Sequence, residues 1–264
     1  MTTDSCAVIT GAASGIGRAL AVAAASRGLF VALADLDGPG LQRTADEIAA
    51  RGGRALTRTL DVCSAGAMAD FADAVGREAP PAQLLFANAG YLRAGPWWRQ
   101  PAEEIRRSLE VNVIGVVNTV QAFLPGMIGH GGPGRVAITG SVGSLLAAPG
   151  LGAYAASKHA VLALAETLKH DLEAQGSAIG VSLVCPGAVR TGLLDAAPSD
   201  LGARLQGRLK ARMDEAGLEP ARLAEIVFDG IDQRRFWIFP QPAFKAAAGK
   251  RFEGILAEAD PERP

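Results

Sequence analysis

The segment that decides the fold is Thr10-Gly11-Ala12-Ala13-Ser14-Gly15-Ile16-Gly17, which follows a short apolar run and opens a segment of helical length. Glycines at a strand-to-helix junction permit a tight turn and let backbone N–H groups approach a pyrophosphate at the positive helix end. The spacing is G-x-x-x-G-x-G rather than the commoner G-x-G-x-x-G. An ordinary glycine turn is the alternative, but the position after the first strand favours a dinucleotide site.

Short apolar runs alternate with longer helical segments along the whole chain. Continuous apolar strands separated by helices are typical of a parallel sheet covered on both faces. We therefore predict an α/β fold of the Rossmann type, a doubly wound, mostly seven-stranded parallel sheet in a single domain over residues 1–264, with ligands at the carboxyl ends of the strands. The predicted strands are Cys6–Thr10, Phe30–Ala34, Ala55–Leu60, Gln83–Ala87, Arg135–Thr139, Gly180–Cys185 and Phe236–Phe239.

The composition indicates a soluble, cytoplasmic protein. The chain has 264 residues, 26 basic and 27 acidic side chains and a net charge of -1, with no basic stripe for nucleic acid and no polybasic tail for a membrane. No signal peptide is apparent, and no apolar stretch approaches the roughly 20 residues that span a bilayer. Cys6, Cys63 and Cys185 lie far apart, so we expect buried free thiols in a reducing compartment and no metal site.

The segment Tyr154-Ala155-Ala156-Ser157-Lys158 carries the candidate chemistry. On a helix, Tyr154 and Lys158 are i,i+4 neighbours and project from one face. A free phenol has a pKa of about 10, and a nearby cation favours the phenolate and lowers that pKa. The alternative is a phenol and an ammonium that pair by accident.

Two further polar residues accompany this pair. Ser141 follows the fifth predicted strand and faces the carboxyl-end crevice, 13 positions before Tyr154. Asn112 lies in the apolar helical run Glu103–Phe123, where an amide must find hydrogen-bond partners. A satisfied core asparagine is the alternative interpretation of Asn112.

Asp35 ends the second predicted strand. A carboxylate there accepts hydrogen bonds from adenosine ribose hydroxyls and repels a 2′-phosphate. Because neither Ser14 nor Leu36 is basic, NAD is favoured over NADP; a solvated turn is the alternative. Three more segments follow strands at the same edge of the sheet: Asp61-Val62, Asn88-Ala89-Gly90 and Pro186-Gly187-Ala188-Val189-Arg190-Thr191.

A helical lid is predicted over about 191–217, and a C-terminal tail over about 256–264. Pro198-Ser199 can cap a helix with an i,i+4 apolar stripe at Leu201, Leu205, Leu209 and Met213. Tethered after a crevice loop, this helix is interpreted as a substrate lid, with ordinary core packing as the alternative.

Taken together, these residues resemble the short-chain dehydrogenase/reductase family from Cys6 to about Ile255. The matching features are the glycine segment 10–17, Asp35, Asp61-Val62, Asn88-Ala89-Gly90, Asn112, Ser141, Tyr154-Ala155-Ala156-Ser157-Lys158 and Pro186-Gly187 with Thr191. Gly140 and Ala87 depart from residues common in the family, and neither departure removes a catalytic group. The segment from Gly217 to Pro240 looks like a bacterial branch that acts on hydrophobic or aryl secondary alcohols.

The resemblance implies a catalytic tetrad. Tyr154 is the acid/base, Lys158 lowers its pKa and binds the nicotinamide ribose, Ser141 positions the substrate oxygen, and Asn112 holds a water that relays protons from Lys158. The cofactor site then comprises Gly11, Ser14, Gly15, Ile16, Gly17, Asp35, Leu36, Asp61, Val62, Asn88, Ala89, Gly90, Tyr154, Lys158, Pro186, Gly187, Val189 and Thr191.

The expected substrate is a hydrophobic secondary alcohol or its ketone, because the candidate wall is apolar. Its residues, with Ser141 and Tyr154, are Leu92, Trp97, Leu145, Leu193 and Leu194. An NADPH-dependent 3-oxoacyl thioester reductase is the alternative enzyme, and a non-catalytic dinucleotide sensor or scaffold is the alternative from another class. The resemblance further implies a homotetramer (or homodimer) assembled through the helix Tyr154–Gln175 and its predecessor.

Overall fold

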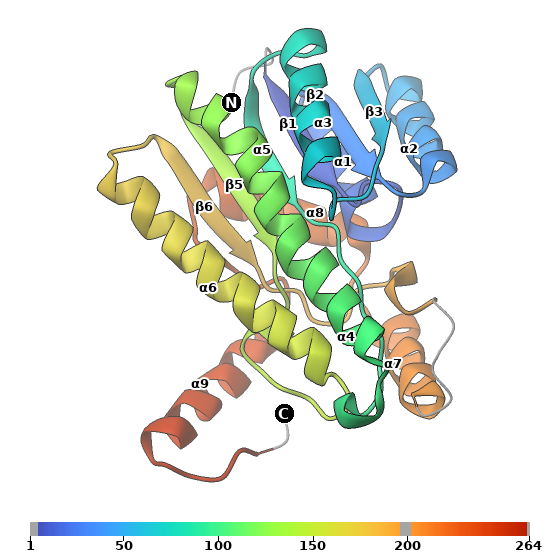
Figure 1. Cartoon of the computed structure of the whole chain (residues 1–264), viewed down its shortest axis with the longest axis vertical. Helices are drawn as coiled ribbons and strands as arrows, with labels where there is room; N and C mark the ends of the chain where they lie inside the picture. The colour runs from blue at the N-terminus through green and yellow to red at the C-terminus, as the bar shows by residue number, and fades with distance from the viewer. Residues whose placement is uncertain (1–4, 196–201, 263–264) are drawn as a thin grey trace.

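The computed structural model describes residues 5–195 and 202–262, and these residues form three layers (Figure 1). The middle layer is a parallel sheet of seven described strands in the order β3-β2-β1-β4-β5-β6-β7. The predicted doubly wound parallel sheet is therefore confirmed. Its strands are β1 Cys6–Thr10, β2 Phe30–Asp35, β3 Ala55–Thr59, β4 Ala82–Ala87, β5 Gly134–Thr139, β6 Ile179–Val184 and β7 Trp237–Ile238.

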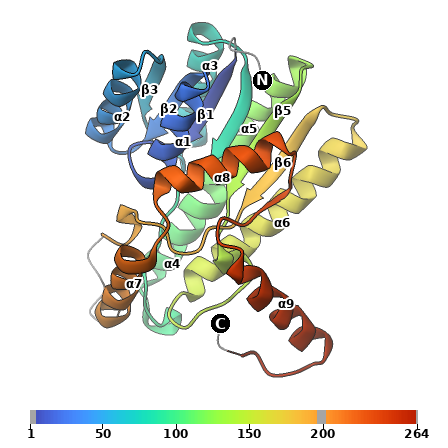
Figure 2. The ribbon, with the colours of Figure 1, turned by 180° about the vertical axis from the view of Figure 1, so that it is seen from behind.

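Helices cover both faces of the sheet (Figure 2). Their starts follow local chemistry: the Asp37 side chain caps α2 by accepting from Gly40 N at 3.0 Å, and Ser64 caps α3 by accepting from Ala67 N at 3.2 Å. The α-helices are α1 Gly15–Ser26, α2 Gly38–Ala50, α3 Ala65–Glu78, α4 Ala102–Leu109, α5 Gly115–Gly129, α6 Gly152–Ala174, α7 Ala203–Ala216, α8 Pro220–Asp232 and α9 Ala243–Leu256. Short helical turns are η1 Trp97–Arg99, η2 Glu110–Ile114, η3 Val142–Ser144 and η4 Gly192–Leu194.

The predicted strand boundaries agree with the structure to within one residue. The last strand, predicted over Phe236–Phe239, is one residue shorter at each end, because it pairs with β6 only at Trp237 and Ile238. Within the predicted lid, Pro198, Ser199 and Leu201 lie outside the described residues. The last two residues of the predicted tail, 263–264, also lie outside them.

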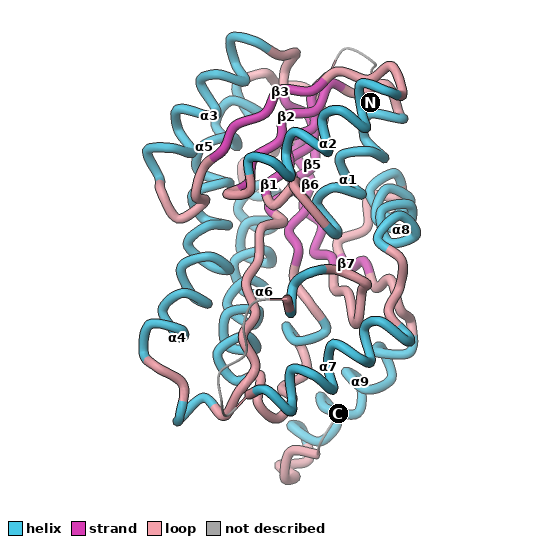
Figure 3. The backbone as a smooth tube through the Cα atoms, turned by 90° about the vertical axis from the view of Figure 1, so that its right-hand side faces the viewer, coloured by secondary structure: helices cyan, strands magenta, loops and turns pink. Residues whose placement is uncertain are grey.

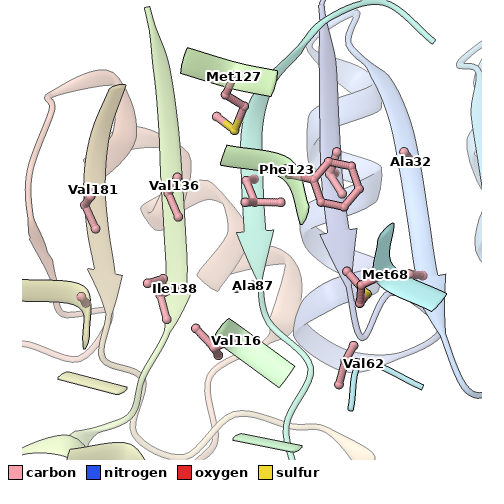
Figure 4. Packing of buried hydrophobic residues seen from close by; sticks show 14 of the residues in the cluster. Ala32, Val62, Met68, Ala87, Val116, Phe123, Met127, Val136, Ile138 and Val181 are labelled. Atoms are coloured by element: carbon pink, nitrogen blue, oxygen red, sulfur yellow. The ribbon is translucent and has the colours of Figure 1, made fainter. Parts of the chain in front are cut away.

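Successive side chains of a strand point to opposite faces of the sheet, so the strands contribute to two separate hydrophobic cores. In β1, Cys6 and Val8 pack under α3, α5 and α6, whereas Ala7 and Ile9 pack under α1, α2 and α8. Figure 4 shows the first core, where Phe123 lies over the strands. A buried side chain of this size contributes about 1.5–3 kcal/mol to folding, so both cores fix the sheet on which the site is built.

One helical stretch differs from the expectation that no segment is long and apolar enough to span a bilayer. Residues Ala102–Gly129 form a continuous helix of 28 residues that is long and apolar enough, by length and composition only, to cross a bilayer. In the structure this helix packs on β4 and α3, and the rings of Phe123 and Phe71 meet edge to face with centroids 5.4 Å apart. The sequence signal is therefore that of a core helix.

The carboxyl ends of the strands open towards the end of the molecule that carries α4, α7 and α9 (Figure 3). The chain leaves β1 for β2 and β3 and then crosses back to β4, so the strand order reverses between β1 and β4. Such a reversal separates the loops that follow the two strands and creates a crevice for ligands.

Candidate active site

Helix α6 brings Tyr154 and Lys158 together one turn apart. Both side chains are buried, with only 8% and 3% of their surface exposed. The Lys158 Nζ atom lies 5.8 Å from the centre of the Tyr154 ring and donates a hydrogen bond to the Thr139 carbonyl at 2.7 Å. The lysine is thus anchored to the end of β5 while it stays beside the tyrosine.

Ser141 meets Tyr154 from the turn after β5. Its hydroxyl forms a hydrogen bond with the Tyr154 phenol and also accepts from Gly143 N at 3.0 Å. Gly143 keeps this approach open, because a Cβ there would stand 3.3 Å from Tyr154 Cε1 and 3.4 Å from Ser141 Oγ. The predicted group of serine, tyrosine and lysine is therefore one cluster.

The titration behaviour of this cluster differs from what the resemblance implied. Burial raises the pKa of Tyr154, although the hydrogen bond with Ser141 acts to lower it. Burial also lowers the pKa of Lys158 to about 8. Removal from water disfavours the charged forms of both side chains. Lys158 also donates to the Thr139 carbonyl rather than to the phenol. The described residues alone therefore do not lower the pKa of Tyr154.

Asn112 lies at the centre of η2, a single π-helical turn between α4 and α5. Its side chain is fully buried; Oδ1 accepts from Tyr91 N at 2.7 Å, and Nδ2 donates to Tyr91 O at 2.9 Å and to Ser157 Oγ at 2.9 Å. A Cβ on Gly90 would stand 3.5 Å from Asn112 Oδ1 and 4.0 Å from Lys158 Nζ. Asn112 is therefore a fully hydrogen-bonded core asparagine that also adjoins the lysine.

The glycine segment forms the turn that the sequence predicts. Gly11 and Gly15 adopt left-handed φ angles of +69° and +51°, which glycine tolerates best. A Cβ on Gly17 would stand 2.0 Å from the Gly11 carbonyl oxygen. Ser14 precedes α1 without a side-chain cap, and no acidic residue occupies the first turn of this described helix. A cradle that only glycine can form, at a positive helix end, fits a pyrophosphate.

Asp35 closes this cradle from the end of β2. Its carboxylate accepts from Ala13 N and from Asp37 N, both at 3.0 Å. Leu36, the next residue, is exposed. The carboxylate is thus held beside the glycine turn, where a ribose is expected.

Threonines at two strand ends connect the cofactor loops, and the sequence reasoning missed them. Thr139 Oγ1 donates to Asn88 Oδ1 at 3.0 Å, and Asn88 Nδ2 donates to Thr10 O at 3.0 Å. Thr10 Oγ1 in turn accepts from Asn88 N at 3.0 Å and Ala89 N at 3.2 Å. A threonine at the carboxyl end of β1 and of β5 is the signal that identifies this network.

The remaining cofactor candidates divide into two groups. Thr191 contacts the glycine turn, since a Cβ on Gly15 would lie 2.9 Å from Thr191 Cγ2, and Pro186 O accepts from Val142 N at 2.9 Å. Asp61 instead accepts from Cys63 N and pairs with Arg107 at 3.3 Å. Burial acts to raise the pKa of Asp61, but these contacts outweigh it and lower the pKa. The Asp61 carboxylate is therefore already bound by Cys63 and Arg107.

An apolar cluster lies on Tyr154. Leu92, Ala94 and Leu194 are its other buried members, and the stripe of α7 packs on it through Leu205, Leu209 and Met213. Leu193 lies at its edge. The structure thus joins the predicted wall residues Leu92, Leu193 and Leu194 to the tyrosine.

Two predicted wall residues lie apart from this cluster. Leu145 packs with Leu146 and with Ala248 of α9, in a cluster separate from the one that contains Tyr154. Trp97 leaves 57% of its surface exposed and rests on Gly152, where a Cβ would meet Trp97 Cδ1 at 2.7 Å. The prediction that Leu145 and Trp97 line the substrate site therefore stays a prediction, whereas Leu92, Leu193 and Leu194 lie in the cluster on Tyr154.

A groove of about 1090 Å³ lies between α1 and α8, outside this cluster. Gly15 and Thr191 border it, but its lining, as far as the chain is described, does not include Tyr154. Charged residues on it are paired, for example Arg18 with Glu47 at 2.6 Å. The groove therefore has the character of a solvated charged surface.

Known proteins match this chain over its whole length. A family model described as short chain dehydrogenase matches residues 5–202. A 1-deoxy-11-beta-hydroxypentalenate dehydrogenase from Streptomyces exfoliatus is 34% identical over 251 residues, covering 94% of this chain and 87% of the relative. A C alpha-dehydrogenase from Sphingobium is 29% identical, covering 98% and 89%.

Solved structures agree with this. A short chain dehydrogenase/reductase from Burkholderia phymatum in complex with NAD superposes with a TM-score of 0.96 at 36% identity, covering 100% of this chain and 99% of that one. The glycine cradle fits the pyrophosphate of a nicotinamide dinucleotide, and the named relatives are dehydrogenases. The chain therefore belongs to the short-chain dehydrogenase/reductase family, as an oxidoreductase that uses a nicotinamide dinucleotide.

Proposed function

We propose that this protein uses NAD to interconvert a hydrophobic secondary alcohol and its ketone, with Tyr154 as the acid/base. The observation that carries the proposal is the apolar cluster of Leu92, Leu194 and the α7 stripe directly on Tyr154. A substrate carbon skeleton held there replaces water on apolar surface, while its oxygen meets the hydroxyls of Tyr154 and Ser141. The named activity of the Streptomyces relative, a dehydrogenase of a hydroxypentalenate, supports the same class of substrate.

The protein's own residues manage the proton. In oxidation, the phenolate oxygen of Tyr154 takes the hydroxyl proton of the alcohol, and in reduction the phenol returns it. Ser141 donates a hydrogen bond to the substrate oxygen and so holds it within reach of the phenol. Lys158 passes the proton on through a water at Asn112, whose carboxamide adjoins the lysine.

The cofactor is held by the glycine cradle and Asp35. The pyrophosphate would lie on the α1 amides near Gly15, and the adenosine ribose on Asp35; Lys158 and Thr191 would hold the nicotinamide end. When bound, the cofactor accepts or returns the hydride, and its positive ring adds a charge that favours the Tyr154 phenolate. This charge supplies the lowering of the tyrosine pKa that burial alone opposes.

A panel of alcohols with NAD or NADP tests the reaction class. The panel contains aryl, cyclic, terpenoid, steroidal and 3-hydroxyacyl thioester alcohols, and reduced nicotinamide is followed by its near-ultraviolet absorbance. Turnover of an apolar alcohol with NAD is the expected result. Preference for NADP and a 3-hydroxyacyl thioester would instead establish the reductase alternative.

The variant Tyr154→Phe tests the acid/base. We expect turnover to fall about 100-fold or more, because the ring remains but the transferable proton is lost. Calorimetry should give unchanged NAD affinity, which separates a chemical defect from a binding defect. Unchanged turnover would refute the role of Tyr154, and NAD binding without any turnover in the wild type would favour a sensor or scaffold.

We also propose that the protein is a cytoplasmic homotetramer (or homodimer), with α5 and α6 at one interface. Apolar side chains on this face of the sheet are exposed: Leu109 at 40%, Ile114 at 45% and Leu164 at 37%. Burying them against a second copy would remove apolar surface from water. The three cysteines are free thiols, which supports a reducing compartment.

A further inference from the structure

We propose that Tyr91, Arg93 and Glu104 form a clamp that positions Asn112 and the wall residue Leu92; we call these three residues the Glu104 clamp. The clamp deepens the proposed function and rests on it, since it acts on proton transfer through Asn112. Its members are positioning residues, because their contacts run to Asn112 and to the helix that carries it.

Both carboxylate oxygens of Glu104 are engaged. The Tyr91 hydroxyl donates a short hydrogen bond to Oε2, and Arg93 Nη1 donates to Oε1 at 2.6 Å. The Arg93 and Glu104 side chains are only 25% and 21% exposed. Charge-assisted hydrogen bonds that are partly removed from water hold their geometry better than ion pairs on an open surface.

Tyr91 acts in this clamp as a protonated phenol. Burial raises its pKa, and the hydrogen bond to Glu104 raises it further, while Arg93 acts in the opposite direction. The phenol therefore keeps its proton at neutral pH and donates it to the carboxylate. This distinguishes Tyr91 from Tyr154, which must gain and lose a proton.

Tyr91 is tied to one helix at two points. Its backbone N–H and carbonyl bind the carboxamide of Asn112 at 2.7 and 2.9 Å, and its phenol binds Glu104, which lies eight positions earlier in the continuous helix Ala102–Gly129. The two attachments fix both the place and the rotation of the Tyr91 backbone relative to the helix. The carboxamide of Asn112 is therefore held by a peptide that Glu104 holds in turn.

Successive residues of the segment 91–94 contact Glu104 and the apolar cluster on Tyr154 in alternation. Tyr91 and Arg93 bind Glu104, whereas Leu92 and Ala94 belong to the apolar cluster on Tyr154. An extended chain directs successive side chains to opposite sides. Fixing the outer side chains thus also fixes where Leu92 meets the substrate.

The effect reaches the lysine through one more contact. Ser157, which directly precedes Lys158, accepts from Asn112 Nδ2 at 2.9 Å through its hydroxyl oxygen. The same hydroxyl donates to the Tyr154 carbonyl oxygen at 2.7 Å. A shift of the Tyr91 peptide therefore displaces the carboxamide that adjoins the relay lysine. Rate loss through misplacement of a relay group is the expected consequence.

Hydrogen exchange measured by mass spectrometry on the free protein tests the clamp without any substrate. In Tyr91→Phe and Glu104→Gln, we expect the peptide spanning 88–95 to exchange about fivefold faster or more, since the contact between the Tyr91 phenol and the Glu104 carboxylate that holds this segment on the helix is lost or weakened. Glu103→Gln is the matched control, because this neighbour on α4 is 78% exposed and pairs only loosely with Arg106 at 3.4 Å. Wild-type exchange in both test variants would overturn the clamp.

Steady-state kinetics with NAD and an alcohol oxidised by the wild type provide the second readout. We expect kcat to fall about fivefold in Tyr91→Phe, with NAD affinity unchanged and a larger solvent isotope effect, because proton transfer becomes slower. Unchanged kcat together with faster exchange would overturn the positioning role. If the wild type oxidises no alcohol, the proposed function fails, whereas the exchange experiment still decides whether the clamp exists.

Discussion

Lys158 shows how burial sets the behaviour of a single residue. The residue is 3% exposed, and its ammonium lies 5.8 Å from the centre of the Tyr154 ring. Taking a charge out of water favours the neutral amine, which lowers the pKa of Lys158 to about 8. The folded protein therefore carries a destabilising charge on Lys158 at neutral pH.

The first prediction concerns the pH dependence of stability. The folded-state pKa of about 8 lies below the ordinary value of 10.5, so the unfolded chain binds the extra proton between these values. The penalty is complete below pH 8 and is relieved as pH rises, which makes the lysine's contribution to stability increase with pH. Relative to Lys158→Met, wild-type stability should rise by up to about 1.4 kcal/mol per pH unit from pH 8 to 9.5.

Urea unfolding at several pH values measures this difference. Lys169→Met is the control, because Lys169 pairs with Glu173 on the surface of α6. Tyr154 and Cys185 titrate above the chosen window, since burial raises the pKa of both. A difference that stays flat with pH would contradict the lowered pKa of Lys158.

Asp35 carries the second prediction. In Asp35→Asn, the side-chain oxygen can still accept from Ala13 N, but the negative charge opposite a 2′-phosphate is lost. Hydrogen bonds to a charged group contribute about 1.5–3 kcal/mol, so the ratio of kcat/KM for NAD over NADP should fall about 10- to 100-fold. Asp46→Asn, the same charge change on the outer face of α2, should leave this ratio unchanged. Equal ratios in wild type and Asp35→Asn would refute the role of Asp35.

At the scale of elements, the packing of α1 on the glycine turn determines the cofactor site. In Gly17→Ala the new Cβ would meet the Gly11 carbonyl oxygen at 2.0 Å, and backbone cannot swing aside as a flexible side chain can. We expect about 1–3 kcal/mol of lost stability and at least about tenfold weaker NAD binding, because the helix must move away from the loop.

Gly76→Ala in α3 is the matched substitution. A Cβ at Gly76 meets nothing within 4 Å, so alanine should stabilise the helix by up to about 1 kcal/mol and leave NAD affinity unchanged. Thermal unfolding and calorimetry measure both quantities. If the two alanines behave alike, the close approach of α1 to the glycine turn is not what makes Gly17 necessary.

At the scale of the whole molecule, the helices that cover one face of the sheet expose large apolar side chains. Leu164 on α6 is 37% exposed, on the face shared with α5. Light scattering at micromolar concentration should give four times (or twice) the chain mass for the wild type. Leu164→Glu should reduce this mass, because a charge cannot be buried unpaired at an interface. Gln42→Glu on α2, on the opposite face, is the control, and a monomeric wild type would refute the assembly.

The sequence identified the fold and the family and brought out the candidate site residues, because its signals are local. The glycine turn, the apolar strands and the spacing of Tyr154 and Lys158 are each encoded within a few positions, and parallel topology then brings the strand ends together. Every predicted strand end was right to within one residue, and β7 is shorter at both ends because it pairs with β6 only at Trp237 and Ile238.

Only the tertiary structure decided how distant segments meet. Thr10 and Thr139 end β1 and β5 and Asn88 follows β4, so the threonines at the strand ends mark candidate residues of this network but do not show that they pair. The clamp on Asn112 joins Tyr91 to Glu104 across a loop, and no local pattern indicates it. Leu145 packs with Ala248 of α9 in a cluster separate from that of Tyr154. The sequence by itself thus determined the fold class and the candidate reacting groups, because the signals of both are short-range. Three-dimensional packing decided the pKa values, the substrate wall and the support of Asn112, because burial and long-range contacts exist only in the folded chain.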